Sequence, residues 1–193
     1  MYTKRNDEIV TDAGLELLIE RAKSDDADAF GKLYDMYVDR IYRHVYYRVG
    51  NAADSEDLTQ EVFMKAWQAI GRYKITGTPF LAWLMRISHN LVVDSYRKKK
   101  KDELHLDDDS WITDSAPTPE EAAELGYGQK RLRRAILELH GDQQQVLMMH
   151  FIEGFTYAEI ASSLGKREGA IRVIQHRALT RLRQILEKEK DVR

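Results

Sequence analysis

The sequence predicts an all-α protein made of two helical domains that are joined by a flexible acidic linker. Apolar residues recur at helical spacing toward both ends of the chain, and no stretch alternates over enough residues to suggest a sheet. The 26 residues 102–127 contain nine acidic residues, no lysine or arginine, and two of the three prolines. This composition is typical of a linker. We therefore expect an N-terminal domain at 1–101 and a C-terminal domain at 128–193.

The N-terminal domain is expected to begin with two helices. The first opens at Thr11 or Asp12, either of which can be its N-cap. The second spans residues 26–49 and is ended by Gly50 and Asn51. Its apolar residues recur near helical spacing: Phe30, Leu33, Tyr34, Tyr37, Ile41, Val45 and Val49. We expect this stripe to face the core.

Two more helices are expected before the linker. Residues 55–73 form a helix that Ser55 can cap. Its apolar face consists of Leu58, Val62, Phe63, Ala66, Trp67 and Ile70. After a turn, Thr78 as N-cap and Pro79 at the first helical position open the last helix, which ends in a run of lysines. Its expected core residues are Phe80, Trp83, Leu84, Ile87 and Leu91.

The clearest functional signal lies in residues 155–183, "FTYAEIASSLGKREGAIRVIQHRALTRLR". Ala161 supplies a small residue where two helices cross, Gly165 supplies the turn, and Ile171 and Ile174 seat the second helix, as a helix-turn-helix requires. Cations follow the turn, which suits a helix that enters the DNA major groove. The predicted DNA contacts are Lys166, Arg167, Arg172, His176, Arg177 and Arg181. A helical hairpin with a solvated basic face is the alternative.

Two stretches of the N-terminal domain carry unusual polar residues. In "SEDLTQEVFMKAW", a polar face opposite the apolar one is formed by Asp57, Gln60, Glu61 and Met64, and it reads on chemistry alone as a solvated surface. In "RYKITGTPFLAWLMRISHNLVVDSYRKKKK", aromatic residues lie beside cations, the combination that single-stranded nucleic acid binding uses. The alternative there is that the aromatic residues belong to the core.

Taken in order, these segments resemble a known family. The stretches "DAFGKLYDMYVDRIYRHVYYRVGNAADSEDLTQEVFMKAWQAI" and "FLAWLMRISHNLVVDSYRKKK", followed by the helix-turn-helix, are similar to bacterial RNA polymerase sigma factors of the extracytoplasmic-function (ECF) type of the sigma-70 family. The resemblance covers about residues 14–101 and 128–187. It implies a specificity subunit that is not an enzyme. Its implied partners are the clamp helices of the largest subunit of core RNA polymerase, promoter DNA, and an anti-sigma factor.

The resemblance also implies roles for residues in this sequence. Contacts to core polymerase are expected from Asp57, Gln60, Glu61 and Met64. Promoter melting around minus ten, with capture of a flipped base, is expected from Arg72, Tyr73, Lys74, Phe80, Arg86, Asn90, Arg97, Lys98 and Lys99. The helix-turn-helix is expected to bind the element around minus thirty-five. There Val173 and Ile174 replace the more usual Ser and Arg, which leaves fewer polar contacts to bases.

The block of acids after the lysines suggests a role for the linker. A flexible coil of 26 residues spans only about 25–31 Å on average, whereas sites two helical turns apart are separated by about 70 Å. The linker is therefore expected to be held stretched in a cationic channel of the polymerase. The alternative is that its acids only keep it soluble or mask the basic modules.

The sequence gives less support to other classes of function. A stand-alone helix-turn-helix regulator with an N-terminal sensing or dimerisation domain is the alternative function, but it leaves the polar face and the lysine run unexplained. The six histidines form no metal-ligand spacing, and no glycine loop could cradle a phosphate, so we expect neither an enzyme nor a bound cofactor or metal. No apolar run is long enough to cross a bilayer, which favours a cytoplasmic protein without membrane insertion.

Overall fold

The computed structural model describes residues 12–75, 78–103 and 127–191, and every regular element in them is helical. The first group of helices comprises α1 (Asp12–Lys23), α2 (Ala27–Val49), α3 (Ala52–Ala69) and α4 (Phe80–Glu103). The second comprises α6 (Tyr127–Leu137), α7 (Gly141–Leu147), α8 (Tyr157–Leu164) and α9 (Glu168–Asp191). A 3₁₀ turn (Ile70–Arg72) follows α3, and a π-helical turn (Met148–Ile152) follows α7. The all-α prediction is confirmed.

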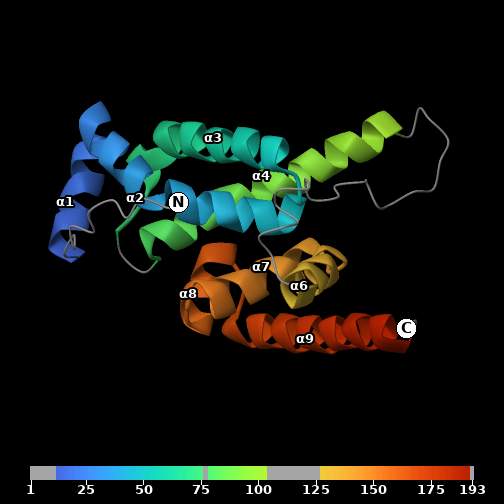
Figure 1. Ribbon diagram of the computed structural model, residues 1–193. Coiled ribbons are helices and arrows are strands. Elements are labelled where there is room, and N and C mark those ends of the chain that lie inside the picture. The colour runs from blue at the N-terminus through green and yellow to red at the C-terminus, as the bar shows by residue number, and fades with distance from the viewer. Residues whose placement is uncertain (1–11, 76–77, 104–126, 192–193) are drawn as a thin grey trace.

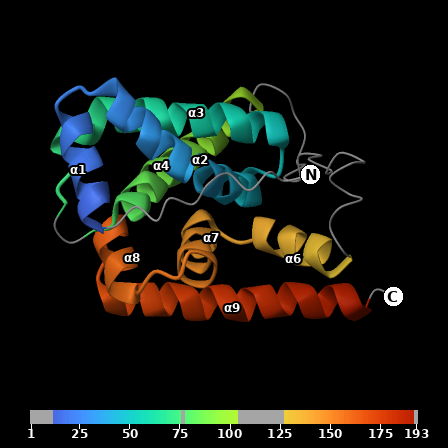
Figure 2. The ribbon, with the colours of Figure 1, turned by 60° about the vertical axis from the view of Figure 1, so that its left-hand side comes forward.

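The two groups of helices form two packed layers (Figures 1 and 2). Helices α1 to α4 make one bundle, in which α2 packs against α1, α3 and α4. Helices α6 to α9 lie against one side of this bundle, and the long helix α9 runs along the outer edge of the molecule. Contacts between the layers come from α6 against α2 and from α7 and α8 against α4. None of the described helices is long and apolar enough to span a membrane.

The turn between α2 and α3 corrects one predicted cap. Gly50 ends α2 in the left-handed conformation (φ 83°), as expected. The next residue, Asn51, is the N-cap of α3, since its side chain accepts a hydrogen bond from the amide of Asp54 (2.9 Å). The prediction that Ser55 caps this helix was therefore wrong. Ser55 lies in the first turn, buried, and its hydroxyl donates to the Asn51 carbonyl oxygen (2.5 Å).

The start of α4 also differs from the predicted one. The carbonyl oxygen of Pro79 accepts the first helical hydrogen bond, from the amide of Trp83 (3.1 Å). The hydroxyl of Thr78, which was expected to cap α4, lies instead 2.5 Å from the hydroxyl of Ser162 on α8. At its other end α4 continues to Glu103, two residues into the predicted linker. The last residue of the predicted linker, Tyr127, begins α6. Residues 104–126 lie outside the described part of the chain, so the role of the linker stays a prediction.

The apolar interior is continuous between the two layers. The predicted stripes of α2, α3 and α4 meet in one cluster, with Leu33, Val62 and Leu84 fully buried. The second layer contributes to the same cluster through residues that include Val146 and Ile160, both also fully buried. A smaller cluster between α6, α7 and α9 consists of Ala135, Leu139, Leu147, Ala178 and Ile185. The described protein is thus closed, with the second domain packed on the first.

Candidate polymerase and nucleic-acid interfaces

The polar face predicted on α3 is exposed to solvent in the structure. Asp57, Gln60, Glu61 and Met64 are all exposed, and Met64 keeps 62% of its surface accessible. Glu61 forms a solvent-exposed ion pair with Lys65 (3.4 Å) one turn further on. The opposite face of α3 is buried in the first domain. An exposed stripe of acids and amides beside a thioether is therefore presented on a rigid helix, where a partner can reach it.

The helix-turn-helix is formed by α8 and α9, with the predicted turn. Thr156 and Glu159 cap α8 reciprocally: the Thr156 hydroxyl accepts from the Glu159 amide (3.2 Å), and the Glu159 carboxylate accepts from the Thr156 amide (2.8 Å). Gly165 ends α8 in the left-handed conformation (φ 63°). Ile171 is fully buried against α8, as predicted. These contacts fix the orientation of α9.

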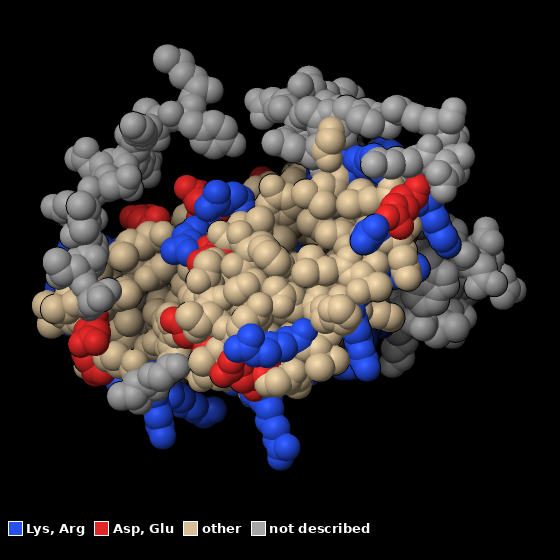
Figure 3. Space-filling model, turned by 90° about the horizontal axis from the view of Figure 1, so that it is seen from below, with Lys and Arg blue, Asp and Glu red and all other residues tan. Residues whose placement is uncertain are grey.

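The predicted DNA-contacting side chains lie on the outer surface of α9 and, for Lys166 and Arg167, in the turn that precedes it. All six are exposed: Lys166, Arg167, Arg172, His176, Arg177 and Arg181. Lysine and arginine side chains project from the face of the molecule seen in Figure 3, several of them beside acidic residues. Two of the six are engaged within the protein, since Lys166 pairs with Asp142 (3.2 Å) and Arg172 pairs with Glu168 (2.6 Å). Among the described residues, the other four form no ion pair that would compete with a phosphate or a base.

Tyr157 supports this face and was not identified from the sequence. The guanidinium of Arg172 lies over its ring, 4.2 Å from the centroid, and the ring of His150 stacks on it at 4.6 Å. The Tyr157 hydroxyl donates to the side chain of Gln175 (2.8 Å). A tyrosine in the first turn of α8 is thus in contact with two side chains of α9. The sequence did offer a signal for Tyr157, because it is an aromatic residue directly after the N-cap of α8. Its contacts on α9 could not be predicted, since they depend on how the two helices cross.

The predicted base-capturing loop is partly closed. Tyr73 and Phe80 are buried, with 6% and 3% of their surfaces exposed, and each ring packs against Trp83 at 5.1 and 5.3 Å between centroids. The Tyr73 hydroxyl donates to the carbonyl oxygen of Thr78 (2.7 Å), and burial raises the pKa of Tyr73 to about 12. In this arrangement the two rings form the base of the loop. They offer no open face on which a nucleobase could stack.

The cations predicted around that loop are accessible. Those described as exposed are Arg72, Lys74, Arg86, Arg97 and Lys98, together with the polar Asn90. Arg97 has a weak contact with Asp94 (3.9 Å). The side chain of Lys99 lies outside the described part of the structure. These side chains extend from the loop along α4, as a track for a nucleic-acid backbone requires.

A group of buried polar residues at the boundary between the domains was missed. His44 and Arg48 of α2 are almost fully buried and face Gln144 and Gln145 of α7. Burial, together with the positive charge of Arg48, lowers the pKa of His44 to about 3. The sequence did contain a signal, because His44 and Arg48 continue the helical spacing of the buried Ile41. Two polar residues on an apolar stripe indicate a partner from elsewhere in the chain.

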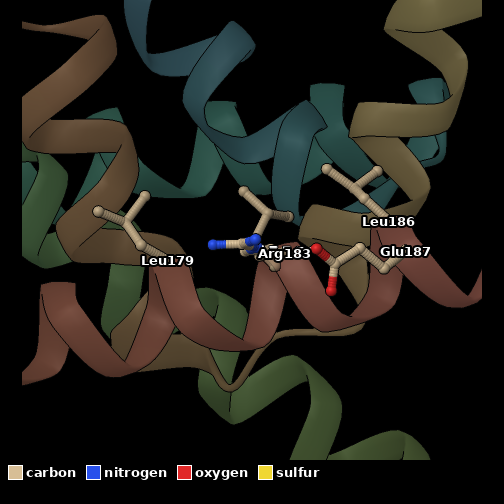
Figure 4. Close-up of a pocket in the computed structure, with 5 residues that line it drawn as sticks. Leu179, Arg183, Leu186 and Glu187 are labelled. Carbon is tan, nitrogen blue, oxygen red and sulfur yellow. Dashed lines mark hydrogen bonds and ion pairs between the residues drawn. The ribbon is translucent and has the colours of Figure 1, made fainter.

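The surface of α9 also carries a shallow groove further along the helix (Figure 4). It is lined by Leu179, Leu182 and Leu186, and Arg183 donates to Glu187 (2.8 Å) at its rim. The lining is mainly apolar and open to solvent. It lacks the convergent polar groups that orient a small ligand in a binding pocket.

Comparison with known proteins identifies the two domains. The family description "Sigma-70 region 2" matches residues 33–102, and "Sigma-70, region 4" matches residues 129–182. The ECF RNA polymerase sigma factor SigW of Bacillus subtilis is 32% identical over 178 residues, which cover 87% of this chain and 94% of SigW. The ECF RNA polymerase sigma factor BldN of Streptomyces coelicolor is 38% identical over 170 residues, 88% of this chain. The chain spans 64% of the length of BldN.

Solved structures show the same fold. The sigma factor RpoE of Bartonella quintana, in complex with the anti-sigma factor NepR, matches with a TM-score of 0.69 and 24% identity over 82% of this chain and 96% of its own. CnrH, in complex with the cytosolic domain of CnrY, matches with a TM-score of 0.65 and 24% identity over 89% of this chain and 96% of its own.

The fold and the two matched regions first define a class, namely helical proteins that join a sigma-70 region 2 to a region 4. Within this class, the 32% sequence identity to SigW over 94% of that protein points to the ECF group. The chain belongs to the ECF sigma factors of the sigma-70 family.

Proposed function

We propose that this protein binds core RNA polymerase and directs it to promoters. The observation that carries the proposal is the presence of regions 2 and 4 in order, each with an exposed surface of the right chemistry. On region 2 this surface is the polar stripe of α3, and on region 4 it is the cationic face of α9. A protein that bound DNA alone would have no use for the stripe on α3.

Each surface has a distinct role in the proposal. The α3 stripe docks on the clamp helices of the largest polymerase subunit. The loop before α4, with the cations along α4, holds the strand that melts around minus ten. Arg172, His176 and Arg177 on α9 face the element around minus thirty-five, where arginine can bind guanine bidentately. Val173 is exposed beside them and suits contact with a thymine methyl group.

An anti-sigma factor is the further partner that we propose. The two solved sigma factors of similar fold, RpoE and CnrH, are described in complexes with NepR and with the cytosolic domain of CnrY. This chain shares the fold, which supports a partner of the same kind. Co-purification of the tagged protein from its own cells would identify such a partner.

The proposal is tested first at the polymerase contact. Transcription in vitro with core polymerase and a library of genomic promoters should yield specific transcripts only when the protein is added. The double variant Gln60→Ala/Glu61→Lys should lose binding to core polymerase, because it removes an amide and reverses a charge on the exposed stripe. Asp35→Lys, an exposed charge reversal on α2, is the matched control. Normal core binding by the double variant would place the docking surface elsewhere.

The second test concerns promoter selection. Arg177→Ala should lower affinity by about 1–3 kcal/mol and relax preference at one position of the upstream element. Arg183→Ala, at a position further along the same helix where the side chain is paired with Glu187 (2.8 Å), should leave preference unchanged. Unchanged preference in Arg177→Ala would leave that residue at most a phosphate contact. Tight binding to promoter duplex without core polymerase would favour a stand-alone regulator instead.

A further inference from the structure

The ring of Tyr157, in the first turn of α8, lies between two side chains from other elements. The guanidinium carbon of Arg172 on α9 is 4.2 Å from the ring centroid. The centroid of the His150 ring is 4.6 Å away, and the two rings are nearly parallel (23°). Two groups this close to the centroid cannot share one face of the ring, because their atoms would overlap. Tyr157 is therefore enclosed by His150 on one face and by Arg172 on the other.

The position of this ring is fixed at both ends of the side chain. The backbone of Tyr157 directly follows the capping box that begins α8. Its hydroxyl donates to the side-chain oxygen of Gln175 (2.8 Å), which lies three residues after Arg172 on the same face of α9. His150 is held in turn, since its Nδ1 donates to the carbonyl oxygen of Phe155 (2.9 Å). The ring thus has a defined place against α9.

The guanidinium of Arg172 is restrained in two different ways. The ring of Tyr157 faces its plane and favours a stacked orientation through cation–π attraction. The carboxylate of Glu168, one helical turn earlier, accepts a hydrogen bond from Nη2 (2.6 Å) and limits rotation within that plane. An exposed ion pair along a helix is weak by itself. The ring therefore supplies the restraint that an ordinary surface ion pair lacks.

Arg172 remains able to bind DNA in this orientation. Its side chain is 58% exposed. A guanidinium carries several N–H donors in a planar fork, and only Nη2 is used in the bond to Glu168. Arg177, further along α9, is also exposed, but among the described residues it has neither an ion pair nor an aromatic ring beneath it. The two arginines that α9 presents to DNA thus differ in how far they are restrained.

This difference affects the free energy of binding. An arginine that is mobile in the free protein loses rotamer freedom when it contacts a base or a phosphate, and this loss weakens binding. A planar guanidinium that is already stacked has lost much of that freedom before DNA arrives. The contact that Arg172 makes with DNA therefore costs less entropy than the contact of Arg177.

We propose that Tyr157 is a positioning residue for the upstream promoter element, which holds the guanidinium of Arg172 in the orientation that DNA requires. The inference rests on the proposed function, because it takes α9 as the helix that binds this element. In this role Tyr157 does not need to touch DNA itself. Its effect passes through Arg172, so removal of the ring weakens binding only while Arg172 is present.

The first experiment observes the free protein by nuclear magnetic resonance. In the wild type, the ring current of Tyr157 should shift the side-chain protons of Arg172 upfield of those of Arg177, and the order parameter of the Arg172 Nε–H group should be the higher of the two. Tyr157→Leu should abolish both differences, whereas Tyr157→Phe should retain them because it keeps the ring. An Arg172 side chain as mobile as that of Arg177 in the wild type would overturn the proposal, and this comparison needs no variant to fold.

The second experiment measures binding of the complex with core polymerase to a promoter obtained from the transcription library. Tyr157→Leu should weaken binding roughly three- to tenfold in the otherwise unchanged protein, but less than about twofold in Arg172→Ala. Tyr42→Leu is the matched control, since it removes a half-buried ring of α2 that stacks on Tyr46 (5.8 Å), and its effect should be the same in both backgrounds.

Two results of this cycle would contradict the proposal. Equal losses from Tyr157→Leu with and without Arg172 would show that the ring only stabilises the fold. A loss in Tyr157→Phe as large as that in Tyr157→Leu would exclude the face of the ring as the restraint.

The two measurements separate this inference from the proposed function. If the wild-type protein supports no specific transcription with core polymerase, the proposed function fails together with the promoter role of Tyr157, while the resonance comparison still decides whether the ring holds Arg172. If transcription is specific but Tyr157 and Arg172 act independently in the cycle, the proposed function stands and the inference fails.

Discussion

The interior of the first domain and the boundary between the two domains are both buried, but they are built from different side chains. Inside the first domain, α2, α3 and α4 meet through fully buried apolar residues such as Leu33, Val62 and Leu84, and the buried ring of Phe63 packs against the partly exposed Tyr34 (4.7 Å between centroids). At the boundary, apolar residues alternate with hydrogen-bonded amides, a histidine and two arginines.

The difference shows which contact is permanent and which can separate. Apolar side chains gain nothing from water when they are exposed, so this apolar interior stays closed as long as the domain is folded. Buried polar groups exchange their protein partners for water on separation, so their net contribution is small. The polar groups of the boundary therefore add specificity, while the buried apolar residues beside them, such as Val146 and Ile160, supply most of its strength.

The largest effect is expected inside the first domain. Phe63→Ala should lower the free energy of unfolding by about 3–5 kcal/mol, because it leaves a cavity among the aromatic rings of α2 and α3. Urea unfolding followed by circular dichroism measures this change. Leu17→Ala, at a largely exposed position on α1, should change little. If Phe63→Ala separated the domains while leaving unfolding unchanged, the contrast between interior and boundary would be broken.

An intermediate effect is expected from the ion pair between the layers. Arg40 of α2 donates from Nε (2.8 Å) and Nη2 (2.5 Å) to Glu153, whose side chain is only 4% exposed. Arg40→Ala should weaken closing by about 1.5–3 kcal/mol, because the Glu153 carboxylate is left without its partner. Energy transfer between two dyes, attached at the exposed positions 35 and 188 after Asp35→Cys and Lys188→Cys, reports the fraction of molecules whose domains are separated. Arg21→Ala removes an ion pair within the first domain, with Asp26, and should leave the distance between the domains unaltered.

A smaller and graded effect is expected from pH. In the closed form the pKa of His44 falls from 6.5 to about 3, and that of His89 to about 4, in both cases mainly through burial and with the charge of Arg48 adding to it. The open form therefore binds protons more readily once pH drops below 6.5, and closing weakens as pH falls from there toward 3–4.

Moving from pH 7.5 to 5.5 should raise the separated fraction roughly tenfold for each histidine that gains solvent on opening. Groups that face these rings are Gln145 and Asp142 of α7, together with Lys166. His44→Gln should flatten the response by removing one titrating group. A separated fraction that is independent of pH would contradict the assignment of His44 to the boundary.

The smallest effect is expected at a helix cap far from the boundary hydrogen bonds of Gln145. Thr156→Ala should lower the free energy of unfolding by about 1 kcal/mol, because the amide of Glu159 loses its acceptor. Thermal unfolding measures this loss, and the distance between the dyes should not change. A clear increase in that distance would mean that the ends of α8 also control closing.

Much of the local structure could be predicted because its causes are local. Helical spacing of apolar residues predicted the helices of the first domain and most of their buried faces, although Tyr34 of the predicted α2 stripe is exposed, and Gly165 with Ala161 and Ile171 predicted the helix-turn-helix. The two wrong caps, Ser55 and Thr78, have a common reason. Several residues near the start of a helix can serve as its N-cap. The backbone geometry of the neighbouring turn, or a distant hydrogen-bond partner, decides whether a given hydroxyl does so.

The class of fold, the order of the two domains, and the polar, exposed faces of α3 and α9 could be predicted from the sequence. These properties follow from residue spacing within one helix, which a linear pattern contains. The closing of the domains on each other and the contact of Gln145 with His44 and Arg48 could not be predicted in this way. Those partners lie about a hundred residues apart along the chain, on opposite sides of the linker. Their pairing depends on how two folded surfaces fit, because each polar group is stable when buried only against its particular partner.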